Sequence, residues 1–168
     1  MRIAKDGEVH VSAPWGLPKW MVERFVEEHR EWIAQARERA LAREERRSRF
    51  YARLPLETKA QKQEASRRLD AIVGPMVERH AAEMGVRPST IGYKPMRSKW
   101  GHCNLRTHVI CFSTYLLLLP EWCIEHVVVH EMCHLLQSGH GPKFHALMDR
   151  FFPRWREANK ETNRMIRE

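Results

Sequence analysis

Three histidines and one glutamate between residues 130 and 140 have the types and spacing of a metal-dependent catalytic site. His130 and His134 are four residues apart, so on a helix their imidazoles project from one face toward a common point. Neutral imidazole is a favourable ligand of Zn²⁺. Glu131 lies one step round the helix, beside such an ion, where its carboxylate could take a proton from a zinc-activated water. The H-E-x-x-H pattern therefore predicts hydrolytic metal chemistry if the surrounding chain supports it.

The surrounding residues supply a third ligand. Gly139 is expected to end the helix, and the turn there would return His140 over the helix beside His130 and His134. Three protein ligands with one position open for water is the arrangement of catalytic zinc, whereas a structural site normally closes with a fourth ligand. The spacing predicts His130, His134 and His140 as the metal ligands and Glu131 as the general base.

The elements that position this site can be read from the apolar pattern. Pro120 opens a helix whose apolar side chains lead into the motif, as expected for a buried central helix. Pro142 starts a further helix, and the tail to Glu168 reads as a charged amphipathic helix. Short strands are predicted at Ile91–Tyr93 and His108–Ser113. Around Asp6-Gly7, residues 2–4 and 9–11 predict a hairpin.

Long helices are predicted between the hairpin and the first of these strands. One runs from about Pro18 to a break at Leu54-Pro55, and a second from about Glu57 to Met84, with Gly85 as its stop. His80 lies on the apolar face of the second helix and is interpreted as a packed histidine. We expect a single domain, 1–168, with residues 1–84 forming the hairpin and helices and residues 85–168 the catalytic core.

Composition limits the partners and the compartment. The net charge of +8 permits a weak association with nucleic acid but does not demonstrate it. The arginines of the basic helical segment, residues 37–47, are expected to form ion pairs with neighbouring glutamates, which reduces their free positive charge. No segment is long and apolar enough to predict a membrane span. The four cysteines form no C-x-x-C pair, and the first residues lack the apolar core of a secretory signal. We expect a cytoplasmic protein with reduced thiols.

The sequence resembles the YgjP-like metallopeptidase family, zinc proteins related to the SprT-like proteases. The resemblance covers nearly the whole chain through "DGEVHVSAP", "FVEEHREWI", "MRSKWGHCN" and "VVVHEMCHLLQSGHGPKFH". It implies an α+β fold, a compact zincin-like domain with a small, mostly antiparallel sheet packed on a central H-E-x-x-H helix. It also implies zinc ligation by His130, His134 and His140, Glu131 as general base, and a sheet edge that pairs with an extended peptide. The strand at His108–Ser113 is our candidate for that edge.

Two residues depart from the family pattern near the predicted site. His102 stands where the family has Ser, and His145 stands where it has Trp; each is either an additional metal-binding group or a neighbour of the site. Trp100 and Gly101 are expected to have structural roles, with Gly101 allowing its loop to lie close to the H-E-x-x-H helix. The donor that stabilises the oxyanion is not determined by the sequence. The candidates are Arg97, Lys99, His102, Tyr115 and His145.

Three functional hypotheses follow. The leading one is a zinc metallopeptidase that hydrolyses peptide or protein substrates. A second directs the same chemistry at nucleic-acid-associated proteins, as the SprT-like resemblance and the charge suggest. The third is a non-catalytic binding module in which His102, Cys103 or His145 closes the zinc site as a fourth ligand. The sequence determines neither the substrate nor the oligomeric state.

Overall fold

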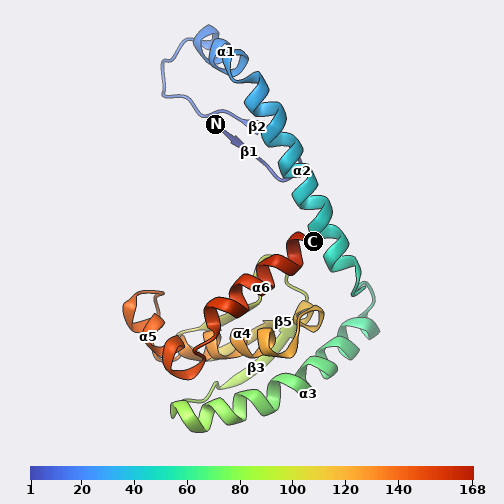
Figure 1. Cartoon of the computed structure of the whole chain (residues 1–168), viewed down its shortest axis with the longest axis vertical. Helices are drawn as coiled ribbons and strands as arrows, with labels where there is room; N and C mark the ends of the chain where they lie inside the picture. Colours follow the sequence, from blue (N-terminus) through green and yellow to red (C-terminus); the bar gives the residue numbers. More distant parts are fainter. The chain divides into compact units, whose positions relative to one another are not determined.

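The computed structural model describes residues 1–168, which form six α-helices and two small sheets (Figure 1). The chain divides into two compact units, residues 1–50 with 167–168 and residues 51–166. The H-E-x-x-H residues 130–134, called the metal motif below, belong to the second unit. The predicted α+β class is confirmed, with helices dominating and a small sheet beside the motif helix. No helix combines the length and the apolar character that crossing a bilayer requires.

The first unit begins with the predicted hairpin. Strands β1 (Arg2–Ile3) and β2 (Val9–His10) pair antiparallel, and Gly7 in the turn has a φ of 84°, which favours glycine. Two helices follow, α1 (Lys19–Glu28) and α2 (Arg30–Ala52). Glu–Arg pairs occur along them as predicted, at Arg24–Glu28, Arg30–Glu27 and Arg49–Glu45.

The prediction of one helix from Pro18 to the Leu54-Pro55 break was wrong at His29, where the structure separates α1 from α2. The His29 side chain explains the interruption. Its Nδ1 donates to the carbonyl oxygen of Phe25 at 2.8 Å, and its backbone N–H turns to the carbonyl of Val26 instead. A side chain that bonds to a nearby carbonyl in this way competes with the helical hydrogen bond.

The sheet of the second unit has three strands in the order β3-β5-β4. Strand β3 (Thr90–Lys94) runs parallel to β5 (Val109–Ser113), and β4 (Gly101–Asn104) runs antiparallel to β5. The expectation that the strand at His108–Ser113 forms the edge was wrong, because β5 is central. The edge beside the metal motif is β4, which contains a glycine and two polar residues and therefore gives a weak strand signal.

Helices enclose this sheet and supply most of the core. Helix α3 (Lys59–Met84) begins with a capping box between Thr58 and Gln61 and ends at Gly85, whose φ is 69°. A short 3₁₀ helix, η1 (Thr114–Leu118), leads into α4 (Glu121–Cys133), followed by α5 (Pro142–Phe151) and α6 (Trp155–Arg167). Apolar side chains from α3, β5, α4 and α5 are fully buried together, among them Leu69, Val73, Val77, Ile110, Phe112, Val128, Val129, Met132 and Met148.

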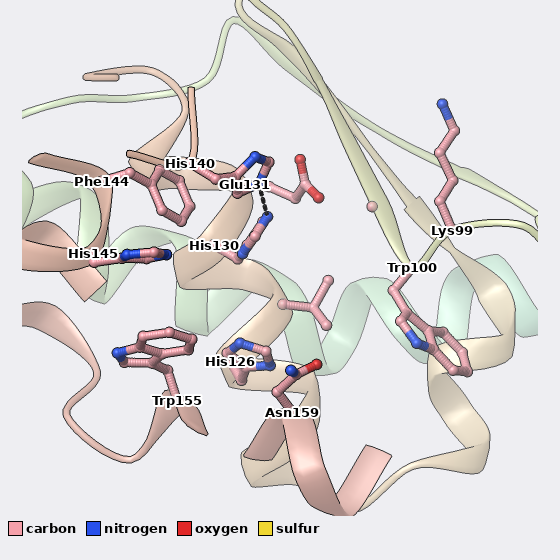
Figure 2. Close-up of a pocket in the computed structure, with 12 residues that line it drawn as sticks. Lys99, Trp100, His126, His130, Glu131, His140, Phe144, His145, Trp155 and Asn159 are labelled. Carbon is pink, nitrogen blue, oxygen red and sulfur yellow. Dashed lines mark hydrogen bonds between the residues drawn. The ribbon is translucent and has the colours of Figure 1, made fainter. Parts of the chain in front are cut away.

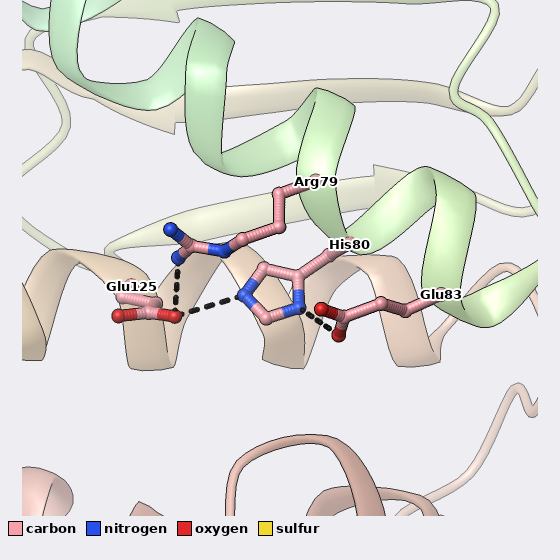
Figure 3. A network of polar contacts seen from close by, with 4 residues as sticks. All are labelled: Arg79, His80, Glu83 and Glu125. Atoms are coloured by element: carbon pink, nitrogen blue, oxygen red, sulfur yellow. Dashed lines mark hydrogen bonds and ion pairs between the residues drawn. The ribbon is translucent and has the colours of Figure 1, made fainter.

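One polar network joins α3 to the motif helix α4 (Figure 3). His80, only 3% exposed, contacts Glu125 through Nε2 at 2.9 Å, and Arg79 donates to the same carboxylate oxygen at 2.6 Å. On the other side of the ring, Nδ1 lies 3.3 Å from Glu83. His80 is thus a packed histidine, as predicted. Its contact with Glu125 holds α3 against α4 five residues before His130.

We expect Glu125→Ala to lower the free energy of unfolding by about 1–3 kcal/mol, because His80 Nε2 would be left buried without its partner. Urea unfolding monitored by circular dichroism measures the change. Glu83→Ala is the matched control, since this exposed carboxylate forms a longer contact with the same ring and should cost about 0–1 kcal/mol. Equal effects of the two substitutions would show that the buried contact does not stabilise α4.

Candidate metal centre

The motif helix ends earlier than the sequence suggested. Helix α4 stops at Cys133, and His134 is its cap residue. The prediction that Gly139 ends the helix was wrong; Gly139 does not have positive φ. The chain tightens immediately after the motif instead, with Leu135 and Leu136 each bonding to a carbonyl three residues back. This early turn leaves residues 137–141 as a loop that carries His140 back to the helix.

The structure brings the three predicted ligands together. The ligand atoms of His130, His134 and His140 all lie within 4.8 Å of one another, and the Nε2 atoms of His130 and His140 are 3.1 Å apart. A tetrahedral zinc ion with Zn–N bonds of about 2.0–2.1 Å separates two ligand nitrogens by about 3.3–3.4 Å. The donor set therefore fits a single zinc-sized ion in both chemistry and spacing.

Phe144 of α5 supports all three imidazoles. Its ring centroid lies 4.9 Å from that of His130, 4.7 Å from that of His134 and 4.7 Å from that of His140, and the side chain is 2% exposed. In addition, His134 Nδ1 donates to the carbonyl oxygen of Gln137 at 3.1 Å, which leaves Nε2 of this ring for a metal. The contact of Phe144 with all three rings depends on the loop between α4 and α5 and therefore could not be predicted from the sequence.

Burial keeps the imidazoles of His130 and His134 in the neutral form. It lowers the pKa of His130 to about 3, with smaller contributions from the neighbouring His134, His126 and His140 rings. It also lowers the pKa of His134, chiefly by desolvation. A neutral imidazole has the lone pair that a metal ion requires, so protons compete weakly for these nitrogens.

Glu131 is 6% exposed and lies between α4 and the edge strand β4. Burial raises its pKa to about 7, while a hydrogen bond from the backbone N–H of Cys103 and the charge of Lys99 act in the opposite direction. A carboxylate with such a pKa can both accept and return a proton near neutral pH. The Cys103 bond also fixes the direction of the carboxylate.

Gly101 makes this arrangement possible, as the sequence predicted. A Cβ atom at position 101 would lie 2.5 Å from both Cγ and Oε1 of Glu131. Only a residue without a side chain lets the backbone of β4 approach the carboxylate so closely. Figure 2 shows Glu131 directed toward this strand while His130 and His140 face each other.

The remaining predicted candidates separate into two groups. His102, Cys103 and His145 do not belong to the histidine cluster, which consists of His130, His134 and His140. Of the possible oxyanion donors, Lys99 and His145 line the cavity at the site. Arg97, His102 and Tyr115 do not line it, and the Arg97 guanidinium lies over the rings of Tyr51 and Tyr115.

The cavity at the site has a volume of ≈ 300 Å³, and His126 is one of its lining residues. His126 is 8% exposed, and burial lowers its pKa to about 4. It lies four residues before His130, so helical spacing alone places both rings on one face. This four-residue spacing is the sequence signal that identifies His126 as a neighbour of the site.

An α+β fold with an H-E-x-x-H helix and a third histidine from the following loop is typical of metal-dependent peptidases. The chain matches the YgjP-like metallopeptidase domain over residues 1–56 and 56–165, and it belongs to this family. It is therefore a metallopeptidase, a hydrolase of peptide bonds, in agreement with the family resemblance of the sequence.

Two metallopeptidase zymogens are among the solved structures that match this chain. Abylysin from Pyrococcus abyssi is 20% identical, with a TM-score of 0.49, over 54% of this chain and 90% of that one. Jannalysin from Methanocaldococcus jannaschii is 20% identical, with a TM-score of 0.44, over 55% of this chain and 88% of that one. No curated protein matches the chain.

The close approach at Gly101 generates a test of the site. We expect Gly101→Ala to leave the fold and the three histidines in place but to displace the flexible Glu131 side chain, reducing peptide hydrolysis about 100-fold or more. Initial rates on a casein or peptide substrate, with thermal unfolding as a check of the fold, measure this effect. Gly92→Ala is the control, because a Cβ there meets only Cys111 Sγ at 3.8 Å. Full activity of Gly101→Ala would show that the Glu131 position is not critical.

Proposed function

We propose that the metal is zinc, held by His130, His134 and His140, and that Glu131 is the general base of peptide-bond hydrolysis. The observation that carries this proposal is the gathering of three histidine ligand atoms within 4.8 Å, next to a buried carboxylate on the same helix. When bound, zinc polarises the scissile carbonyl and lowers the pKa of the water that it activates.

The residues of the chain perform the proton transfers. Glu131 accepts a proton from the water as its oxygen attacks the carbonyl carbon of the substrate. The C–N bond then breaks, and Glu131 passes the proton to the leaving nitrogen. One water and one peptide bond thereby become a carboxylic acid and an amine, which are a carboxylate and an ammonium ion once the second proton of the water has also been transferred. The N–H of Cys103 holds the Glu131 carboxylate in place during both transfers.

The substrate is an extended peptide that adds to the edge strand β4. Trp100 and Asn104 accept hydrogen bonds from Ser113 and His108, so their carbonyls point toward β5 or its adjoining turn. Because the backbone groups of an antiparallel strand alternate in direction, those of Gly101 and Cys103 point away from β5. The N–H of Cys103 is engaged by Glu131, so the carbonyl of Cys103 and the backbone groups of Gly101 are the ones proposed to bind a peptide. A peptide aligned along this edge would pass Glu131 and the histidine cluster.

This function is favoured over a zinc-stabilised binding module. A structural site normally needs a fourth protein ligand. Neither His102, Cys103 nor His145 belongs to the cluster, which supports a position left for water. The family of the chain points the same way, since it is a family of peptidases.

Glu131→Gln tests the catalytic role directly. We expect zinc to bind at one ion per chain in the wild type and the variant, while hydrolysis falls at least about 100-fold in the variant, because an amide cannot accept the proton. Metal content by mass spectrometry and peptide cleavage by chromatography give the two values. Glu121→Gln, at an exposed position on the same helix, should keep full activity. Hydrolysis that survives Glu131→Gln would rule out the assigned role.

Removal of zinc tests the ligand set. With free zinc at about 100 times its Kd, the bound ion stabilises the fold by about 2.7 kcal/mol, so treatment with a chelator should lower Tm and re-addition of zinc should restore it. His140→Ala should abolish most of this zinc-dependent shift. His145→Ala should preserve it, because His145 lies outside the cluster. A zinc-dependent shift that persists in His140→Ala and disappears in His145→Ala would identify a different third ligand.

A further inference from the structure

The cavity at the metal centre continues beyond the ligands into a recess beside α6 (Figure 2). Neither metal binding nor the general base requires the residues that form it. The recess is defined by six of the cavity-lining residues, which come from α4, α5, α6 and the segment before β4: His126, Val127, His145, Trp155, Asn159 and Trp100.

One wall of the recess is a fixed aromatic surface. The rings of His145 and Trp155 are stacked, with centroids 5.3 Å apart and planes 15° from parallel. The indole N–H of Trp155 donates to Asp149 at 2.8 Å, and Arg156 donates to the same oxygen at 2.7 Å. The Arg156 guanidinium also lies over the Trp155 ring, 4.3 Å from its centroid. Because Asp149 engages the N–H while His145 and Arg156 lie against the ring, Trp155 offers carbon atoms and no hydrogen-bond donor to the recess.

The other surfaces of the recess also lack charge. His126 and Val127 are both buried, and His126 lies 6.0 Å from the ring of Phe152. Lys99 borders the cavity, but Figure 2 shows its side chain directed away from His126 and Trp155. A charged substrate side chain entering this recess would lose its hydration without gaining a partner of opposite charge. An apolar side chain would instead be transferred from water to an aromatic environment.

We propose that this recess is the specificity pocket of the peptidase and takes one large apolar side chain, aromatic or branched aliphatic, from a residue flanking the scissile bond. The placement next to the scissile bond rests on the proposed function, because the histidine cluster and Glu131 stand at its mouth. The whole cavity, including its part at the histidine cluster, has a volume of ≈ 300 Å³, at the lower end of the range for ligand pockets of about 300–1,000 Å³, and the recess is only a part of it. It suits one side chain rather than a longer ligand.

Binding, rather than turnover, provides the test. Zinc-loaded Glu131→Gln protein is titrated by calorimetry with peptides of the form acetyl-Gly-Gly-Xaa-Gly-Gly-amide, where Xaa is Ala, Leu, Phe or Lys. We expect the Leu and Phe peptides to bind about 10- to 100-fold tighter than the Ala peptide, as full burial of a large apolar side chain implies. The Lys peptide should not bind more tightly than the Ala peptide.

Two tryptophan substitutions on α6 form a matched pair, of which only one is expected to fill the recess. Asn159→Trp, added to the Glu131→Gln background, should remove the preference for Leu and Phe. Asn163→Trp, one turn further along α6, should retain it. Both changes break the same Asn163–Asn159 side-chain bond, 3.2 Å long, so the pair differs in whether the added ring enters the recess. Both positions are exposed, and thermal unfolding verifies that each variant is folded.

The outcomes separate this inference from the proposed function. Equal or undetectable binding of all peptides, or a preference that survives Asn159→Trp, would overturn the pocket assignment even if the wild type cleaves peptides. Conversely, a preference that Asn159→Trp removes would support the pocket even if wild-type cleavage proved independent of Glu131. Sequencing of wild-type cleavage products then identifies which side of the scissile bond carries the apolar residue.

Discussion

The burial of Glu131 against the backbone of β4 is the interaction on which the geometry of the site depends. A carboxylate that is 6% exposed loses most of its hydration, and this loss must be offset by specific partners. Cys103 provides a backbone N–H, and Gly101 provides the space. Both belong to the edge strand, so pairing of β4 with β5 simultaneously completes the sheet and fixes the carboxylate. Strand β4 and helix α4 therefore position Glu131 together.

The three ligands need a different kind of support, because they come from a helix and a loop. His130 lies within α4, His134 caps it and His140 follows a tight turn. Phe144 contacts all three rings from the start of the next helix, so the spacing between the ligands depends on how α5 packs against α4. An apolar side chain thus orders a polar cluster. This arrangement leaves the metal-binding nitrogens without competing hydrogen bonds from a polar support.

Local signals predicted much of this structure. The i,i+4 spacing of His130 and His134, the hairpin turn at Gly7 and the helix stop at Gly85 are short-range features, and the elements that they predict are present. Features that depend on tertiary contacts were missed. The position of β4 at the edge follows from pairing across the sheet, and the early end of α4 follows from hydrogen bonds within its last turn and loop. The break at His29 came from a side chain that replaces a helical backbone bond.

The three histidines are held with unequal firmness, and this inequality has a kinetic consequence. His130 and His134 are partly buried on or at the end of α4, whereas His140 is exposed on a loop. All three imidazoles are already gathered, but His140 is the proposed ligand that a movement of residues 137–141 would withdraw first. We therefore expect exchange of the metal to depend more on the opening of this loop than on the stability of the core.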